Sequence, residues 1–269
     1  MIYCAIGDIH GMYNHLIELL DKIETVIDQK YSDDVTFVFL GDYVDRGPDS
    51  RKVVDLLLQR IDDNMNDIIL PGNHEEMMSG ISRYTDSGFK DFMLWWGSWG
   101  GFETLKSYFS KNHDCHDFEN WKKSDFVNHW VEEWLRSFPD HYKFIDNCLN
   151  GVYTPNETAF HLDETDRIMF THAGIHPDIP SFLHNEADFM WSRDAMFLKK
   201  GMKWTEASVD LVVHGHTIMN EEEGTDTHRI GLDRGAYSNG ILASGIFKDG
   251  QQVDTITVTG PPAAYKKPI

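Results

Sequence analysis

The sequence predicts an α/β fold with a parallel sheet, a second and mostly antiparallel sheet, and a helical insertion between them. In the first 80 residues, an apolar run, a polar turn and a helix-like apolar pattern follow one another three times. A tryptophan-rich segment comes next, and short apolar runs return after about residue 140. Because strand and helix alternate in the first part of the chain, that part predicts parallel strands.

In each of the three N-terminal units, a glycine or a Pro-Gly pair follows the apolar run. The runs are residues 2–6, 35–40 and 68–70. Helical spacing follows the first two runs, at Leu16, Leu19, Leu20, Ile23 and Ile27 and at Val53, Val54, Leu56, Leu57 and Ile61. Open α/β sheets bind ligands at the carboxyl ends of their strands, so the polar turns at these ends are candidate site residues.

Residues 80–140 are predicted to form a helical insertion. Six of the eight tryptophans fall in it, namely Trp95, Trp96, Trp99, Trp121, Trp130 and Trp134. The apolar residues Val127, Trp130, Val131, Trp134, Leu135 and Phe138 recur at helical spacing. This spacing favours packing in a core, and stacking of the tryptophans on a base or a sugar is the alternative.

The C-terminal half is predicted to supply the second sheet. Residues 142–145, 168–171, 211–214, 230–232, 241–247 and 253–258 are the predicted strands, and a hairpin turn at residues 248–251 joins the last two. We expect residues 1–260 to form a single domain. Residues 261–269 are then a tail that is either a surface strap or disordered.

The composition restricts the partners and the compartment. Lys and Arg number 24 against 44 Asp and Glu, which gives a net charge of −20 and argues against nucleic acid and anionic membranes as general partners. The three cysteines form no CxxC pair, which argues against a disulfide framework or a zinc cluster. No apolar run approaches the length of a membrane span, and the N-terminus has no leader-like pattern, so we expect a cytoplasmic protein.

Five polar motifs follow predicted strands: GDIHG at 7–11, GDYVDRG at 41–47, GNHE at 72–75, THAG at 171–174 and HGHT at 214–217. If these strand ends converge, the motifs bring together three oxygen and three imidazole ligands, from Asp8, His10, Asp42, Asn73, His172 and His216. Two divalent cations need this mixture, and one carboxylate such as Asp42 can bridge both. A single Asp or His has an ordinary structural explanation, but the joint pattern predicts a dinuclear metal site. His214 is expected to point the same way as His216, since the two are two residues apart on a strand.

The motifs GDIHG, GDYVDRG and GNHE resemble the three signature blocks of the phosphoprotein phosphatase branch of the calcineurin-like metallophosphoesterases. THAG and HGHT resemble its two later histidine blocks, so the resemblance extends from Asp8 to His216. It implies a two-sheet β-sandwich flanked by helices (αββα), with the tryptophan-rich segment as an insertion. The chain lacks a SAPNYC-type loop after its last histidine block, and Ala173 follows His172, so the resemblance is to bacterial or phage serine/threonine phosphatases.

The resemblance also implies roles for individual residues. One ion would be held by Asp8, His10 and Asp42, and the other by Asp42, Asn73, His172 and His216. His74 matches the proton donor and Asp45 the residue that orients it. Arg46 matches a phosphate-binding arginine, and Arg193 in the sequence FMWSRD is the candidate for a second. Tyr237 is expected to line the cleft or to pack in the core, and Asn73 to contact substrate as well as metal.

The implied reaction is the hydrolysis of a phosphate ester by direct attack of a hydroxide that bridges the two metals, without a covalent phosphoenzyme. Manganese is the expected metal, with iron or zinc as alternatives. The favoured substrate is a phosphate monoester on serine or threonine, and in some relatives tyrosine, of a protein. The alternative is a symmetrical dinucleoside tetraphosphate such as diadenosine tetraphosphate. An inactive scaffold is disfavoured because every ligand is intact, and a nuclease is disfavoured by the acidic charge.

Overall fold

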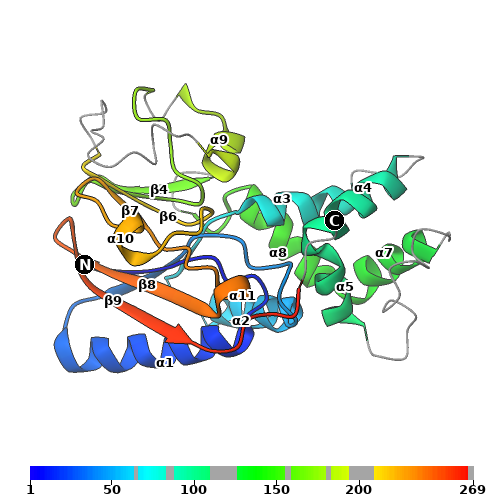
Figure 1. The fold of residues 1–269 in the computed structure, drawn as a ribbon, viewed down its shortest axis with the longest axis horizontal. Coiled ribbons are helices and arrows are strands. Elements are labelled where there is room, and N and C mark those ends of the chain that lie inside the picture. The colour runs from blue at the N-terminus through cyan, green and yellow to red at the C-terminus, as the bar shows by residue number, and fades with distance from the viewer. Residues whose placement is uncertain are drawn as a thin grey trace.

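The computed structural model describes residues 1–63, 66–82, 88–109, 126–154, 159–179, 183–193 and 209–265. Within these ranges the chain forms two sheets packed face to face, with helices outside each sheet (Figure 1). The remaining helices gather at one end of the sandwich, on the side where α3, α4, α5, α7 and α8 are labelled.

The first sheet has five strands in the order β3-β2-β1-β8-β9. They are β1 Ile2–Ile6, β2 Val35–Phe39, β3 Ile68–Ile69, β8 Ile241–Lys248 and β9 Gln251–Thr259. The pairings of β1 with β2 and of β2 with β3 are parallel, as predicted. The prediction that β8 and β9 belong to the second sheet is wrong, because β8 pairs antiparallel with β1. All of β1 is buried, so both of its edges need hydrogen-bonding partners, and β8 supplies the second.

The second sheet has four strands in the order β4-β5-β6-β7. They are β4 Phe160–Asp163, β5 Ile168–Thr171, β6 Leu211–His214 and β7 Arg229–Gly231. The prediction of a mostly antiparallel sheet is wrong, since only β4 and β5 pair antiparallel, while β5, β6 and β7 run parallel. A long connection separates β5 from β6, and connections of this length allow the chain to return and run in the same direction.

The helices and helical turns in chain order are α1 Tyr13–Lys30, α2 Ser50–Asp62, α3 Asn73–Ser79, η1 Gly80–Ser82, α4 Phe89–Trp96, the π-helical turn η2 Gly97–Gly101, α5 Phe102–Tyr108, α7 Phe126–Ser137, α8 Pro139–Leu149, α9 Glu186–Trp191, α10 Glu221–Gly224 and α11 Ala236–Asn239. The predicted strand at residues 142–145 is wrong, because these residues lie in α8. Pro139 occupies the first turn of that helix, and the buried residues His141, Phe144, Ile145 and Cys148 recur at helical spacing.

The core has three parts, which follow the faces of the sheets. Ile2, Cys4 and Ile6 of β1 pack against the helices that cover the first sheet, and Tyr3 and Ala5 face the second sheet. This alternation is the period of a strand with both faces buried. On the outer face of the second sheet, residues of β5 and β6 pack against α9. The layers are therefore helix, sheet, sheet, helix, which confirms the predicted αββα sandwich.

Most of the described residues of the insertion are helical, as predicted. Trp96 and Trp134 are fully buried, and Trp134 meets the ring of Tyr108 edge-on at 5.6 Å between centroids, which agrees with a core role. Trp95 is 45% exposed. Trp121 and the side chain of Trp130 lie outside the described residues.

The two cysteines that the structure describes, Cys4 and Cys148, are buried free thiols. Cys115 lies outside the described residues. None of the described helices combines the length and the apolar character needed to cross a membrane. The hairpin turn predicted at residues 248–251 is present, with positive φ at Asp249 and Gly250 as a tight turn between β8 and β9 requires.

Candidate active site

The carboxyl ends of five strands bring the six predicted ligands together. Asp8 and His10 follow β1, Asp42 follows β2, Asn73 begins α3 just after β3, His172 follows β5, and His216 follows β6. All six side chains are buried. The parallel arrangement of β1, β2 and β3 and of β5 and β6 places these ends at one edge of the sandwich.

The backbone at these strand ends adopts a strained conformation. Seven non-glycine residues have positive φ among those described, and five of them belong to the site: His10, Asp42, Asp45, Arg46 and His216, with φ between 46° and 72°. Each such residue costs about 1–3 kcal/mol. Because the backbone turns sharply at these residues, side chains that are close together in the sequence can point toward the same site.

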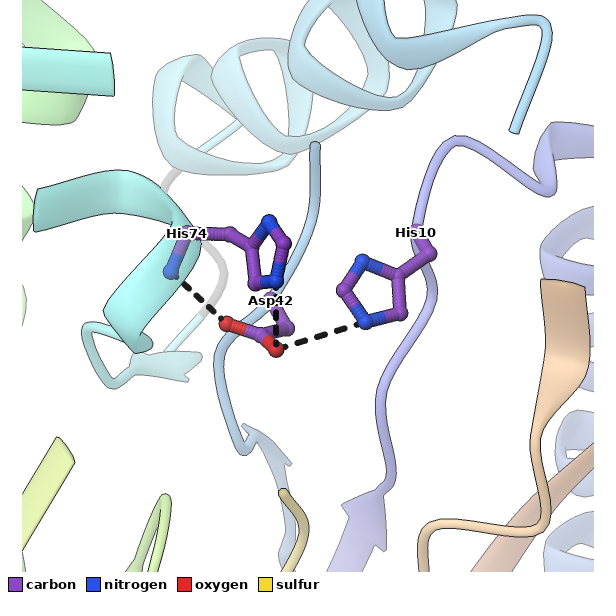
Figure 2. A group of neighbouring side chains, drawn as sticks. All are labelled: His10, Asp42 and His74. Atoms are coloured by element: carbon purple, nitrogen blue, oxygen red, sulfur yellow. Dashed lines mark hydrogen bonds and ion pairs between the residues drawn. The ribbon is translucent and has the colours of Figure 1, made fainter. Parts of the chain in front are cut away.

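Asp42 lies at the centre of the imidazole cluster. Its Oδ2 lies 3.3 Å from His10 Nε2 and 4.0 Å from His74 Nε2, and its Oδ1 lies 3.4 Å from His172 Nε2. Figure 2 shows the rings of His10 and His74 directed toward this carboxylate. Two groups of side chains with the spacing of metal ligands share Asp42: one with His10 and His74, the other with His172 and His216.

The chemistry of these side chains fits two divalent cations. Burial lowers the pKa of His10 to about 4 and that of His216 to about 2, so both rings are neutral at pH 7 and can offer a lone pair. His10 and His172 each donate from Nδ1 to a backbone carbonyl, at 2.9 and 2.8 Å, which directs Nε2 toward Asp42. The Nε2 atom of His216 is buried without a hydrogen-bond partner. Such an atom is an unsatisfied acceptor that a cation would satisfy.

Asp8 and Asn73 complete the set of predicted ligands. Both oxygens of Asp8 accept from the backbone N–H of His216, at 3.0 and 3.1 Å, and Oδ1 of Asn73 lies 3.1 Å from Nε2 of His172. Burial, with the charges of Asp233 and Asp42 nearby, raises the pKa of Asp8 well above its usual value. Asp233, a buried carboxylate beside the ligands, had no predicted role.

His74 and Asp45 form a fully buried pair. Nδ1 of His74 donates to Oδ2 of Asp45 at 2.7 Å, and the insertion supplies two more donors to this carboxylate. Nε1 of Trp96 donates to Oδ2 at 2.9 Å, and Oγ1 of Thr104 donates to Oδ1 at 2.7 Å. Burial raises the pKa of Asp45 to about 7, against these hydrogen bonds. Neither Trp96 nor Thr104 was predicted to reach the site.

Glu75 has a role in the site that its sequence motif did not predict. Its carboxylate accepts from the backbone N–H groups of Asp42 and Tyr43, both at 2.8 Å, and of Gly72 at 3.0 Å. Glu75 therefore ties the turn after β2 to the turn after β3. The only local signal is its position three residues after Gly72, where a capping glutamate is common.

The predicted phosphate-binding residues surround a cavity of about 440 Å³ beside the imidazole cluster. Nη1 of Arg46 donates to Nε2 of His10 at 2.6 Å. The guanidinium of Arg193 lies 3.4 Å from the carbonyl of His216. The ring of Tyr237 meets that of His10 edge-on at 5.1 Å, and Tyr237 both lines the cavity and packs against the core.

Contrary to the expectation, the side chain of His214 does not face the imidazole cluster. Its Nδ1 contacts the carbonyl of Gly215 at 2.8 Å, and its Nε2 lies 3.3 Å from Nη1 of Arg229. Side chains two residues apart point the same way only within a strand. Here β6 ends at His214, and the backbone of His216 has a positive φ.

Buried carboxylate and imidazole groups lie together at the ends of parallel strands, with the spacing of metal ligands. The family model for calcineurin-like phosphoesterases matches residues 1–220. The chain therefore belongs to the calcineurin-like phosphoesterase family, whose members use divalent metal ions to hydrolyse phosphate esters.

Relatives within this family have different substrates in their names. The asymmetrical bis(5'-nucleosyl)-tetraphosphatase PrpE of Oceanobacillus iheyensis is 43% identical over 72 residues, which are 26% of this chain and 28% of that protein. The serine/threonine-protein phosphatase PP1-delta of Caenorhabditis elegans is 34% identical over 94 residues, which are 33% of this chain and 29% of that protein. The chain thus spans less than a third of either relative.

A crystal structure named provisionally as a diadenosine tetraphosphatase has the same fold. Its TM-score is 0.52 at 20% sequence identity, and the match covers 96% of this chain and 93% of that one.

Proposed function

We propose that this hydrolase is a dinuclear metal-dependent phosphatase of the phosphoprotein phosphatase branch, of the bacterial or phage type, that removes phosphate from protein side chains. One observation carries the proposal: Arg46, Arg193 and His216 of the imidazole cluster line one cavity, which suits a single phosphoryl group. We further propose that residues 1–260 form one domain, with residues 80–140 as its insertion and residues 261–269 as its tail.

In this proposal Asp8, His10 and Asp42 would hold one ion, and Asp42, Asn73, His172 and His216 would hold the other. Manganese is the proposed metal, with iron and zinc as alternatives of the same ligand preference. Bound divalent ions would supply Lewis acidity, which activates water and neutralises charge on phosphoryl oxygens.

Arg46 and Arg193 bind and orient the phosphoryl group. A guanidinium can donate two parallel hydrogen bonds to non-bridging oxygens, so it holds the group in one orientation. The ring of Tyr237, 4.6 Å from the guanidinium carbon, restrains Arg46 for this task.

His74 donates the proton to the departing oxygen. Burial and Arg46 lower the pKa of His74 to about 3, so its ring is neutral at pH 7. A phosphate dianion in the cavity offsets the charge of Arg46 and favours the imidazolium, and Asp45 at Nδ1 stabilises the same charged form. Proton donation from Nε2 is thereby coupled to substrate binding.

Charge favours a monoester over a tetraphosphate. Among the described residues that line the cavity, Arg46 and Arg193 are the cationic side chains, and Asp233 is anionic. A dinucleoside tetraphosphate carries about four negative charges, which need more cations than a phosphate monoester does. A dinucleoside tetraphosphatase is the second candidate, favoured by Trp99, which lines the same cavity and could stack on a base.

A direct comparison of substrates tests the proposal. Metal-stripped protein is reloaded with manganese and assayed against phosphoserine, phosphothreonine and phosphotyrosine peptides and against diadenosine tetraphosphate. Higher kcat/KM on a peptide supports the protein phosphatase. Higher kcat/KM on diadenosine tetraphosphate replaces it with the second candidate, and no turnover of any of the four by metal-loaded protein overturns both.

A further inference from the structure

Three aromatic side chains from distant segments line the cavity beside Arg46 and Arg193. Trp99 comes from η2 in the insertion, Tyr237 from α11, and Tyr265 from the segment that follows β9. The rings of Tyr237 and Tyr265 lie 6.2 Å apart at an interplanar angle of 66°. The sequence predicted only Tyr237 as a cavity residue.

The rings of Trp99, Tyr237 and Tyr265 form an aromatic wall of the cavity, and this wall lies directly beside the phosphate-binding groups. The guanidinium of Arg46 lies over the ring of Tyr237, and the same ring contacts His10. A planar group held against this wall would therefore sit next to the phosphoryl group, with few intervening atoms.

The C-terminal strap, residues 261–265, is fixed across this part of the molecule. The backbone N–H of Ala263 donates to the carbonyl of Tyr237 at 2.8 Å, and the hydroxyl of Tyr265 donates to the carbonyl of Ser98 at 2.7 Å. The strap therefore links α11 to η2, and Figure 1 shows the red C-terminal chain passing α11 toward the helices of the insertion.

Gly100 brings η2, and with it Trp99, close to Arg46. The backbone N–H of Arg46 donates to the carbonyl of Gly100 at 3.2 Å. Gly100 has a φ of 110°, and a Cβ at this position would lie 2.5 Å from the backbone nitrogen of Arg46. Only glycine permits this approach without strain.

We propose that Trp99, Tyr237 and Tyr265 form a subsite for the phenyl ring of a phosphotyrosyl side chain, so that phosphotyrosine in proteins is the preferred substrate. This inference rests on the proposed function and narrows it. In phosphotyrosine one oxygen joins the ring to phosphorus, which places the ring at the wall that begins at Arg46. The short alkyl chains of phosphoserine and phosphothreonine would make little contact with the three rings. In a nucleotide, a ribose separates the base from phosphorus.

The substrate preference tests this subsite. The preference is the ratio of kcat/KM for a phosphotyrosine peptide to that for a phosphoserine peptide of the same sequence. We expect Tyr265→Ala and Trp99→Leu each to lower this ratio about five- to tenfold, through loss of ring contacts. Tyr265→Phe keeps the ring and should restore most of the preference. Trp95→Leu is the matched control, because Trp95 is an exposed tryptophan of the same insertion that lines a different groove.

Binding gives a readout that does not depend on turnover. Titration calorimetry compares a peptide carrying phosphonomethyl-phenylalanine with one carrying the phosphonate analogue of phosphoserine. The aromatic analogue should bind about tenfold more tightly, and Tyr265→Ala should remove this difference. Equal binding of the two analogues would overturn the subsite. A larger effect of Tyr265→Ala and Trp99→Leu on diadenosine tetraphosphate than on phosphotyrosine would also overturn it, and would assign the wall to a base.

The phosphotyrosine subsite and the protein phosphatase activity can be refuted separately. Equal kcat/KM on the phosphotyrosine and phosphoserine peptides would refute the subsite and leave the protein phosphatase standing. Ring-dependent binding of the phosphonate without turnover of any peptide would support the subsite and refute the phosphatase.

Discussion

Trp96 donates a hydrogen bond from its indole Nε1 to Oδ2 of Asp45 at 2.9 Å, the same oxygen that accepts from His74 at 2.7 Å. The indole is fully buried and comes from the end of α4. The insertion therefore does more than fill space, because it helps to fix the carboxylate that orients the candidate proton donor. Thr104 of α5 holds the other oxygen of Asp45.

Replacing Trp96 by phenylalanine should impair proton donation more than binding. Trp96→Phe keeps a buried ring but removes the donor to Asp45, so the orientation of His74 loosens. We expect kcat on a phosphoserine peptide to fall about tenfold with KM nearly unchanged. Trp134→Phe is the control, since Trp134 is equally buried in the insertion but packs on Tyr108. Equal losses in the two variants would show that the effect is only one of packing.

Replacing His74 by asparagine tests its role as the acid. A general acid matters most when the departing oxygen is a strong base, so the loss should depend on the leaving group. We expect kcat to fall about a hundredfold on a phosphoserine peptide and much less on an activated aryl phosphate such as p-nitrophenyl phosphate. Rates for a series of leaving groups measure this dependence. The same loss throughout the series would exclude proton donation by His74.

Replacing Asp42 by asparagine should weaken the binding of both ions. Asp42 is the one residue shared by the two groups of candidate ligands, and its loss removes negative charge from each. We expect manganese affinity to fall by about tenfold or more, measured by equilibrium dialysis with elemental analysis. Asp210→Asn is the control, because Asp210 pairs with Arg167 at an exposed position. Retention of wild-type metal content by the Asp42 variant would argue against a shared carboxylate.

His214 should make the stability of the metal-stripped protein depend on pH. Burial, with Arg229 nearby, lowers the pKa of His214 to about 3, whereas an unfolded histidine titrates at about 6.5. Between these values only the unfolded chain binds the proton, so acid favours unfolding. Relative to His214→Asn, the wild-type free energy of unfolding should fall by about 1.4 kcal/mol per pH unit below about pH 6.5. Urea unfolding of both proteins across this range measures the difference, and a difference that does not change with pH would contradict the assignment.

The sequence predicted the parts of the site that short motifs encode. Asp8, Asp42 and Asn73 stand one or two residues after apolar runs, and the parallel pairing of those runs brings them to one edge. The contacts made by the insertion have no such local signature. Trp96 and Asp45 are separated by 51 residues, and a tryptophan at helical spacing is indistinguishable from a core residue until the helix is placed.

For a similar reason, the sequence could not predict which sheet β8 joins. Apolar alternation identifies β8 as a strand, but its pairing with β1 depends on which buried edge remains unpaired after the parallel strands are assembled. Likewise Tyr265 follows a Pro-rich segment, where composition alone left both a strap and disorder open. Its hydrogen bond to Ser98 joins residues that are far apart in the chain, so no local sequence pattern predicts it.

The central claim is that two divalent ions bind on either side of Asp42. Anomalous diffraction from crystals of the manganese-loaded protein tests it most directly. We expect two anomalous peaks that share the Asp42 carboxylate, one in contact with Asp8 and His10 and the other with Asn73, His172 and His216. A single peak, or peaks that do not contact Asp42, would contradict the dinuclear site and the phosphatase chemistry derived from it.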